Sequence, residues 1–328
     1  MKNTEITVET LYQKNKKKLK LKLLNEKLSF GKVISEPDLH RPGLALTGFV
    51  DVFTYSRVQI IGNTEIAYLS TRGKKERVQA IRQLVAFDIP CIIMTENNKP
   101  SPEFLELASE RGITIFGSPY KTTHLMQLLS SYMEATFAPT ETVHGSLVDV
   151  YGIGVLFTGR SGIGKSEVAL DLVERGHRIV TDDVVLISRK TEGVLIGSAS
   201  ETLQHHMEIR GVGLVDVQSI FGIRSIRRQK RIEVEVHLEE WNEKENYERI
   251  GLEEKTTMIL GVEIPVVKLP IFPGKNVTVI AEVVALQQLL KINGIFTAKN
   301  FNERLIKKMQ AKTESVRYLE DYLERDFE

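Results

Sequence analysis

The residues with the clearest chemical potential form a glycine-rich stretch, GRSGIGKS, at positions 159–166. Its spacing is that of a phosphate-binding loop, in which glycines let backbone N–H groups approach phosphate oxygens. In such a loop the lysine, here Lys165, reaches the β- and γ-phosphates, and the hydroxyl of Ser166 ligates Mg²⁺. The sequence therefore predicts a site for a nucleoside triphosphate or another polyphosphate. Its residues are Gly159, Arg160, Ser161, Gly162, Ile163, Gly164, Lys165 and Ser166.

Two adjacent carboxylates, Asp182 and Asp183, follow the apolar residues Ile179 and Val180. A carboxylate at a strand end near a phosphate loop is typical of the Walker-B arrangement, which meets the metal shell. Two carboxylates can divide the work, so that one holds the Mg²⁺ shell and the other acts as a base on an attacking hydroxyl. The alternative is a pair of turn aspartates without a chemical role.

Three further features are less specific. Residues 207–213 (MEIRGVG) combine a carboxylate, a guanidinium and two glycines, which suits a loop near phosphate and metal. The basic residues within 224–231 fit an acidic partner and a solvated edge equally well. His144 stands alone, and an isolated histidine is more often structural than catalytic.

The elements that must hold the loop are visible as hydrophobic patterns. The apolar run 155–157 predicts a buried strand before the loop. The periodic run 168–173 predicts a helix after it, with Gly176 as its C-terminal cap. We also expect a hairpin turn at 151–154 and strand pieces on both sides of the acidic pair. Further along, the proline-rich residues 265–276 predict a loop and residues 279–292 predict a helix.

The N-terminal part alternates predicted strands, 89–95 and 112–116, with predicted helices, which implies a mainly parallel sheet. A first helix is expected at 4–28. The chain is therefore predicted to be an α/β protein of two domains. Residues 1–135 form a scaffold or docking domain, and residues 136–328 form the catalytic domain around the phosphate loop. The other predicted helices are 76–87, 102–111 and about 120–135, and the linker is 138–142.

Composition narrows the classes of function. The chain has 328 residues, of which 42% are hydrophobic, and a net charge of +1. The chain therefore has no overall electrostatic field that would favour binding to nucleic acid. It also has no apolar run long enough to predict a membrane-spanning helix. The single cysteine, Cys91, lies in an apolar run and is predicted to be a packing residue. A chain without an internal disulfide suits the cytoplasm, where we expect this protein.

Taken together in order, the motifs resemble those of the HPr kinase/phosphorylase family, and the resemblance covers nearly the whole chain. In the C-terminal part it rests on His144-Gly145, the loop 159–166, Asp182-Asp183, and three later segments. These are 207–216 (MEIRGVGLVD), 246–251 (NYERIG) and 270–276 (PIFPGKN). In the N-terminal part it rests on 41–44 (RPGL) and 57–65 (RVQIIGNTE).

The resemblance implies a bifunctional protein-serine kinase. ATP or pyrophosphate would phosphorylate a serine of the phosphocarrier protein HPr, and inorganic phosphate would remove the group as pyrophosphate. Asp183 would be the base, Ser166 and Glu208 would bind Mg²⁺, and His144 and Arg249 match further active-site positions, alongside Lys165. The family also implies a homohexamer, a C-terminal domain with a fold like that of phosphoenolpyruvate carboxykinase, and a role in carbon catabolite repression and sugar uptake.

One segment departs from the family pattern, which has arginines around its Pro-Gly. Here the segment reads Ile271-Phe272-Pro273-Gly274-Lys275. Lys275 keeps the positive charge but lacks the bidentate donor of arginine, so the dephosphorylating direction is expected to suffer more than the kinase direction. Two other functions remain open from the residues alone: a small-molecule kinase that uses the same loop, and a nucleotide-binding switch without enzyme activity.

Overall fold

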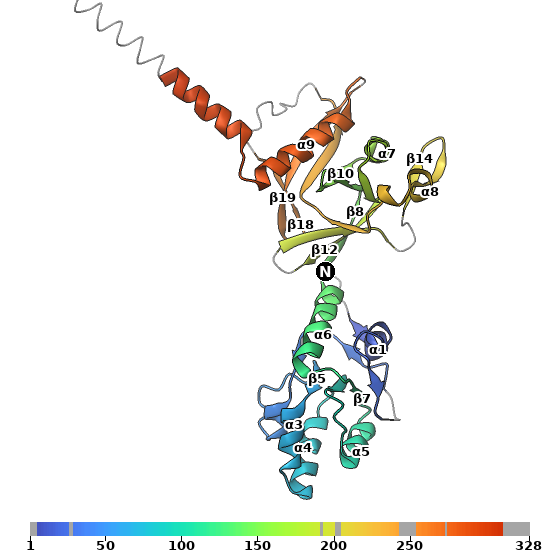
Figure 1. The fold of residues 1–328 in the computed structure, drawn as a ribbon, viewed down its shortest axis with the longest axis vertical. Helices are drawn as coiled ribbons and strands as arrows, with labels where there is room; N and C mark the ends of the chain where they lie inside the picture. The colour runs from blue at the N-terminus through green and yellow to red at the C-terminus, as the bar shows by residue number, and fades with distance from the viewer. Residues whose placement is uncertain are drawn as a thin grey trace, which may run out of the picture. The chain divides into compact units, whose positions relative to one another are not determined.

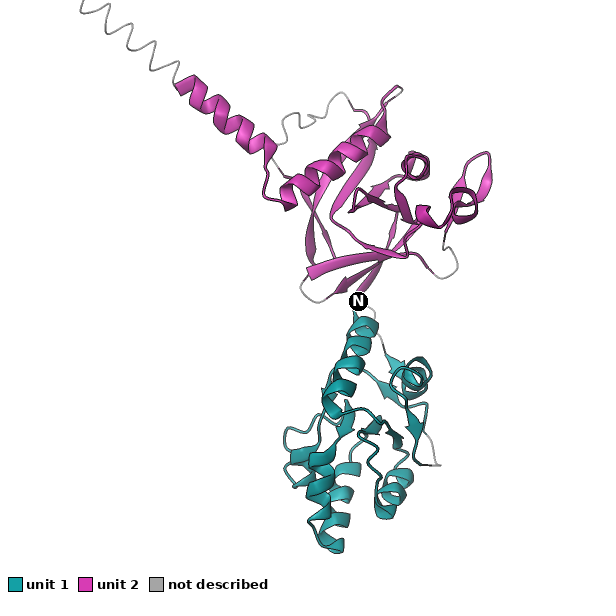
Figure 2. Ribbon diagram, viewed as in Figure 1, with its two compact units in different colours: residues 1–139 teal, residues 140–328 magenta. Residues whose placement is uncertain are grey.

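The computed structural model describes residues 5–25, 29–190, 193–200, 205–242, 254–272 and 274–310. The chain forms two compact units, Met1–Pro139 and Thr140–Glu328 (Figure 2). Both units combine strands with helices, which confirms the predicted α/β class. The expected linker at 138–142 is wrong from residue 140 onwards, because strand β8 (Thr140–His144) begins there.

The N-terminal unit is built on a five-stranded sheet in the order β2-β7-β6-β5-β4 (Figure 1). Strands β4 to β7 are parallel, as predicted, and only β2 at one edge is antiparallel. The three central strands are buried along their whole length, so they read as continuous apolar runs. The strands are β2 (Lys22–Leu23), β4 (Leu39–His40), β5 (Val58–Ile61), β6 (Cys91–Met94) and β7 (Thr114–Gly117); outside this sheet, β1 (Ile6–Thr7) pairs with β3 (Val33–Ile34).

Helices cover both faces of this sheet. Neighbouring residues of β5 point to opposite faces: Ile61 packs in one core with α4 and α5, and Ile60 packs in another with α1 and α6. A sheet covered on both sides can hold its parallel strands away from water. The helices are α1 (Val8–Asn15), α2 (Gly43–Leu46), α3 (Asn63–Ser70), α4 (Lys74–Val85), α5 (Pro102–Glu110) and α6 (Thr122–Phe137).

The helix expected over residues 4–28 is much shorter. It is confined to α1, and the chain then turns through Lys20, whose φ is +50°, into β2. Leu11 of α1 and Leu19, which lies beyond the end of α1 and just before this turn, are buried in the same core. Their shared burial produces a helical spacing in the sequence although the backbone between them is not one helix.

Cys91 is the packing residue that the sequence predicted. Its side chain is fully buried in β6, and burial raises the pKa of its thiol to about 12. A thiol in this state is protonated at neutral pH and is a poor nucleophile.

The C-terminal unit is built on a six-stranded mixed sheet in the order β11-β9-β10-β17-β19-β18. Its centre is parallel, because β10 pairs with β17 and β17 with β19 in the same direction. Strand β10 pairs on its other side with β9 in the predicted hairpin. The strands are β9 (Ser146–Val150), β10 (Ile153–Gly159), β11 (Arg178–Thr181), β17 (Val234–Glu240), β18 (Thr256–Ile259) and β19 (Val262–Ile271).

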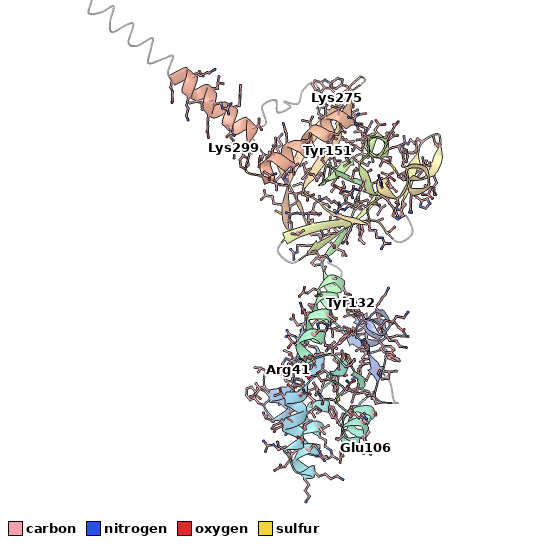
Figure 3. All side chains as sticks on the ribbon, in the orientation of Figure 1. Arg41, Glu106, Tyr132, Tyr151, Lys275 and Lys299 are labelled. Carbon is pink, nitrogen blue, oxygen red and sulfur yellow. The ribbon has the colours of Figure 1, made fainter. Side chains whose placement is uncertain are left out.

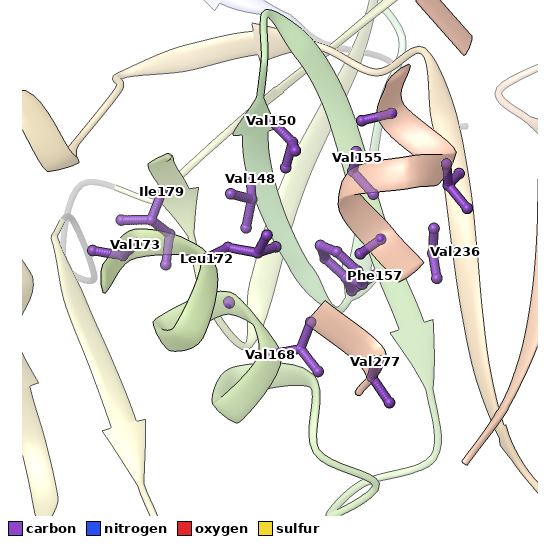
Figure 4. Packing of buried hydrophobic residues seen from close by; sticks show 14 of the residues in the cluster. Val148, Val150, Val155, Phe157, Val168, Leu172, Val173, Ile179, Val236 and Val277 are labelled. Carbon is purple, nitrogen blue, oxygen red and sulfur yellow. The ribbon is translucent and has the colours of Figure 1, made fainter. Parts of the chain in front are cut away.

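Two different layers cover this sheet. On one face, Val155 and Phe157 of β10 pack against α7 (Lys165–Glu174) and α9 (Val277–Ile292), as Figure 4 shows. On the other face, Leu156 of β10 packs with Val185 of a four-stranded sheet, order β16-β13-β12-β8. The further elements are β12 (Val184–Lys190), β13 (Val194–Ser198), β16 (Gln229–Arg231), β14 (His206–Ile209), β15 (Gly213–Asp216) and α8 (Val217–Phe221).

The loop predicted at 265–276 is wrong for its first half, which belongs to β19. Proline is tolerated in a strand where its missing N–H leaves no ladder bond unmade. Pro265 lies where β19 stops pairing with β18 and starts pairing with β17, and Pro270 lies beyond the end of β18. The strand therefore accommodates both prolines.

The predicted helix at 279–292 is confirmed as α9, and a further helix, Thr297–Gln310, follows it. Among the described residues no single helix is long and apolar enough to cross a membrane, although this bent pair reaches the required length and composition together.

A buried carboxylate, Glu282, ties α9 to the end of α7. Its oxygens accept hydrogen bonds from the Arg175 guanidinium at 2.8 and 2.6 Å and lie 3.0 Å from Nε2 of His177. Tyr151, labelled in Figure 3, stacks edge-on against His177 from the β9–β10 turn. The Arg175 hydrogen bond, assisted by His177, lowers the pKa of Glu282 to about 2.

We predict that Glu282→Gln lowers the free energy of unfolding of the C-terminal unit at pH 7 by roughly 1–3 kcal/mol. Urea unfolding measures the change, which appears as a lower midpoint. The folded pKa lies below the ordinary value of 4.5, so the contribution is present above pH 4.5 and is lost as the pH falls towards 2. The control is Glu254→Gln, which removes an exposed partner of Lys291 on the same helix. Equal effects of the two substitutions, or a difference that does not shrink below pH 4.5, would contradict the prediction.

Candidate active site

The glycine-rich loop lies between β10 and α7, as predicted. Gly159, Gly162 and Gly164 have φ values of +134°, +77° and +106°, a region that residues with a Cβ atom rarely adopt. A Cβ atom on Gly159 would also lie 2.3 Å from the carbonyl oxygen of Leu238 on β17. The loop conformation and its close approach to β17 therefore both require glycine at this position.

The N-terminus of α7 is open to an anion. Its N-cap is Gly164, and no side chain among the described residues caps it. The first N–H groups of a helix lack partners within the helix and carry a partial positive charge. The helix is held in place by Val168 and Leu172, which are buried against the sheet. It ends at Glu174, and Gly176, two residues later, has a φ of +96°. The predicted C-terminal cap is thereby confirmed.

Lys165 is folded over the loop that precedes it. Its Nζ donates hydrogen bonds to the carbonyl oxygens of Gly159 and Arg160, each at 3.0 Å. Arg160 in turn pairs with the exposed carboxylate of Glu240 at the end of β17. The ammonium group is thus bound to the first two residues of the loop.

Asp182 is a buried carboxylate, with only 3% of its surface exposed. Its Oδ1 accepts a hydrogen bond from the Ser146 hydroxyl, and the carboxylate also interacts with the Ser166 hydroxyl of α7. Its Oδ2 has no hydrogen-bond partner among the residues that the structure describes. Burial raises the pKa of Asp182, against the hydrogen bonds that lower it. The two members of the predicted acidic pair therefore differ in exposure to solvent, because Asp182 is buried and Asp183 is exposed.

The exposed member of the pair lies beside His144. Residue 183 has a φ of +64°, and its carbonyl oxygen accepts a hydrogen bond from the N–H of Gly145 at 3.0 Å. The next residue, Val184, pairs with His144 in the β8–β12 ladder. A Cβ atom on Gly145 would lie 2.3 Å from the carbonyl oxygen of Phe157, so glycine is required here too. The structure thus brings His144 and Asp183 together at one strand end.

The β14–β15 hairpin reaches the loop from the other side. Met207 of β14 is buried with the residues of α7, and Arg210 lies just after the strand. Both Nη atoms of Arg210 lie 2.8 Å from the point where a Cβ atom on Gly162 would stand. Glu208 lies on the same strand and is exposed. Arg210 was not singled out from the sequence, although its motif mixes charge with glycine in the way that phosphate sites do.

A metal site is not preformed by protein side chains alone. Among the described residues no group of three or more His, Cys, Asp or Glu side chains could hold an ion. The serine hydroxyl of Ser166 and the unpaired oxygen of Asp182 are nevertheless hard oxygen donors of the kind that Mg²⁺ prefers. Mg²⁺ commonly takes one or two carboxylates and completes its shell with water and phosphate oxygens, so these residues fit it.

Two further elements of the predicted site are Arg249 and Lys275. Arg249 and its motif 246–251 lie outside the described residues. Lys275, labelled in Figure 3, folds back on its own segment. Its Nζ donates to the carbonyl oxygen of Pro270 at 2.8 Å and lies 5.3 Å from the centre of the Phe272 ring. Partial burial lowers the pKa of this lysine.

Residues 41–44 and 57–65 of the N-terminal unit meet in one structural arrangement. The buried carboxylate of Glu65 accepts a hydrogen bond from the Gly62 N–H at 2.9 Å and pairs with Arg41 at 2.9 Å. These contacts hold the start of α3. They give Arg41, Gly62 and Glu65 a structural role in the two motifs.

Comparison with known proteins gives a consistent result over the whole chain. Residues 6–133 match the family model described as HPr Serine kinase N terminus, and residues 135–305 match the HPr Serine kinase C-terminal domain. The HPr kinase/phosphorylase of Chloroherpeton thalassium is 48% identical over 100% of this chain and 98% of its own length. That of Prosthecochloris aestuarii is 50% identical with the same coverage. A solved structure of the Hpr(Ser) kinase/phosphatase from Coxiella burnetii is 31% identical, with a TM-score of 0.43, and covers 47% of this chain and 99% of that chain.

We predict that Asp182→Asn stabilises the metal-free protein at neutral pH by about 1–2 kcal/mol, because it removes a buried and incompletely paired charge. The folded pKa is raised above 3.8, so the gain is present at neutral pH and is lost as the pH falls through that raised pKa towards 3.8. Urea unfolding with EDTA measures it. The control is Asp149→Asn on β9, a buried aspartate paired with Arg178 and Arg227, which should destabilise. Destabilisation by Asp182→Asn as large as that of the control would contradict the account.

Proposed function

Because this chain belongs to the HPr serine kinase family, we propose that it phosphorylates a serine of HPr and removes that phosphate by phosphorolysis. The chain is an enzyme, a kinase that acts as a phosphotransferase. ATP or pyrophosphate would be the donor in the forward direction, and inorganic phosphate would be the acceptor in the reverse direction. The observation that carries the proposal is the meeting of the open loop at α7 with two carboxylates of different exposure, Asp182 and Asp183.

The loop would hold the donor's phosphates. Phosphoryl transfer depends mainly on positioning and on neutralising the charge of the transferred group. The N–H groups at the start of α7 have no side-chain cap among the described residues and would donate to the phosphates, and Lys165 would exchange its carbonyl contacts for phosphate oxygens. Arg210 lies against the loop and would add a second cation on the side of Gly162. Arg249 would join them by analogy with the family pattern.

The exposed carboxylate of Asp183 would serve the acceptor. In the forward direction it would take the proton from the serine hydroxyl of HPr while the serine oxygen attacks the terminal phosphorus. In the reverse direction an oxygen of inorganic phosphate would attack the phosphoserine phosphorus. Asp183 would then return the proton to the leaving serine oxygen, and pyrophosphate would be the product. His144, at the same strand end, is placed to contact the acceptor or the phosphoryl group.

Mg²⁺ would be held by Ser166 and Glu208 together with phosphate oxygens, and the buried Asp182 would hold the metal shell from behind. When bound, the ion supplies positive charge that offsets the charge on the phosphates. The interaction of Asp182 with the hydroxyls of Ser146 and Ser166 supports this assignment, because it holds Asp182 and Ser166 next to each other.

We further propose the remaining features that the resemblance implies. The C-terminal unit would share the fold of phosphoenolpyruvate carboxykinase, and the protein would act in carbon catabolite repression and sugar uptake as a homohexamer. The outer face of α9 supports assembly, because Val283, Leu286 and Leu290 are apolar and exposed in the single chain.

We predict that Asp183→Asn lowers the turnover number for phosphorylation of HPr by about 10²–10⁴-fold, because the serine loses its base. The affinity for ATP should stay within about threefold of the wild type, since Asp183 is not one of the residues of the phosphate-binding loop 159–166. Transfer is measured with labelled ATP and Mg²⁺, and affinity by titration with a fluorescent ATP analogue. The control is Asp51→Asn, an exposed aspartate of the N-terminal unit. Full activity of the Asp183→Asn variant would contradict the proposal that Asp183 is the base.

A second prediction concerns the segment that departs from the family pattern. Lys275→Arg should raise the rate of phosphorolysis severalfold relative to the kinase rate, because a guanidinium can bind inorganic phosphate through two donors. The matched control is Lys268→Arg. Lys268 lies on β19, the strand that precedes Lys275, and its ammonium group pairs with Glu239. Unchanged or lower phosphorolysis in the Lys275 variant would show that the lysine is not the limiting feature.

A further inference from the structure

A row of polar side chains lies behind the glycine-rich loop, on the face of the sheet opposite α7. Thr158 is the last residue of β10 before Gly159, and it pairs in register with His237 of the parallel strand β17. Glu235 lies two residues earlier on β17 and therefore on the same face. Thr158 and Glu235 are buried, with 9% and 8% of their surfaces exposed, whereas 39% of the His237 side chain is exposed.

The three side chains form one hydrogen-bonded chain. The Thr158 hydroxyl is bonded to Oε1 of Glu235 and lies 2.8 Å from Nδ1 of His237. The Thr158 hydroxyl is the donor in the bond to Glu235, whose carboxylate oxygen accepts, and a hydroxyl has a single proton to donate. Thr158 Oγ1 must then accept from His237, which assigns the proton of the imidazole to Nδ1. Nδ1 of His237 also lies 3.8 Å from Oε1 of Glu235.

We propose that Thr158, Glu235 and His237 form a positioning network for the phosphate-binding loop, in which the His237 Nδ1–H holds the Thr158 hydroxyl. The proposal rests on the proposed phosphotransfer function and adds three positioning residues to the proposed site. None of them belongs to the loop or to the acidic pair.

The network acts at the point where the loop begins. Gly159 follows Thr158, and its carbonyl oxygen accepts the hydrogen bond from Lys165. Leu238 follows His237, and its carbonyl oxygen is the atom that approaches Gly159 so closely. Two consecutive residues on each strand therefore fix the position of the start of the loop relative to β17. A displacement of 1 Å in such a group can cost about a hundredfold in rate.

Packing alone does not explain these residue types. Burying a carboxylate and a hydroxyl between two sheets has a free-energy cost unless each is hydrogen-bonded. Apolar side chains fill the same layer at Leu156 and Leu147, next to the network. Other charged groups are near: Glu239 follows on the same face of β17, and Lys268 lies opposite His237 on β19.

The first test uses a pair of substitutions at Thr158 in the full chain. Thr158→Val keeps the shape of the side chain and removes the hydroxyl, whereas Thr158→Ser keeps the hydroxyl and removes a methyl group. We expect Thr158→Val to lower the turnover number for HPr phosphorylation by about 10–100-fold. We expect Thr158→Ser to retain at least a third of the wild-type value. If packing is what matters, the order reverses, and that result overturns the proposal.

The second test uses His237, whose partial exposure makes substitution compatible with folding. The side-chain amide of asparagine places a donor near the position of Nδ1, and that of glutamine places it near Nε2. His237→Asn should therefore retain most of the activity, and His237→Gln should lose about as much as Thr158→Val. The pH profile of each active variant should match that of the wild type. Equal activities of the two variants, or an altered profile in His237→Asn, overturn the proposal.

The affinity for a fluorescent ATP analogue separates this proposal from the proposed function. The loop binds nucleotide whatever the acceptor is, so the network predicts weaker binding by Thr158→Val than by Thr158→Ser even in a protein that does not phosphorylate HPr. Failure of the wild type to phosphorylate HPr would contradict the proposed function alone. Equal affinities of the two Thr158 variants together with equal turnover would contradict the network alone.

Discussion

The contact between Gly159 and the carbonyl oxygen of Leu238 is the constraint on which the C-terminal unit depends. It marks the end of the parallel pairing of β10 with β17, and the chain must leave the sheet here with a left-handed backbone. Only glycine allows both. From this point the loop turns into α7, whose apolar face is buried on the same sheet. That junction positions the N-terminus of α7 and Lys165. It also positions the network of Thr158, Glu235 and His237.

The second sheet explains how the acidic pair arrives at the same place. Strands β8 and β12 are neighbours in this four-stranded sheet, and the close approach of Gly145 to the carbonyl oxygen of Phe157 brings the end of β8 against β10. Asp182 is thereby buried between Ser146 and the start of α7, while Asp183 turns outward. One fold thus creates a shielded carboxylate suited to a metal shell and an exposed carboxylate suited to a hydroxyl. The strain and the incomplete pairing lie at the residues that the proposed chemistry uses.

Sequence patterns predicted the local structure around the loop well, because the chemistry of that region leaves traces in residue type. Glycines at positive φ, an apolar strand and a periodic helix are visible without a structure, as the confirmed elements at 153–159 and 165–174 show. The patterns failed where tertiary pairing overrides them. The prolines of β19 are tolerated only because its partner strands change at Pro265, and β8 is a strand only because β12 lies beside it. Arg210, Thr158 and His237 were not predicted, because their positions depend on contacts between distant segments.

The central claim is that one site runs phosphoryl transfer in both directions on HPr. The most direct measurement incubates the wild-type protein with HPr, Mg²⁺ and ATP labelled in the γ-phosphate, and then adds excess inorganic phosphate. The account predicts label on a serine of HPr, followed by its release as labelled pyrophosphate. Release as inorganic phosphate would contradict phosphorolysis, and the absence of label on HPr despite nucleotide binding would contradict the assignment of the substrate.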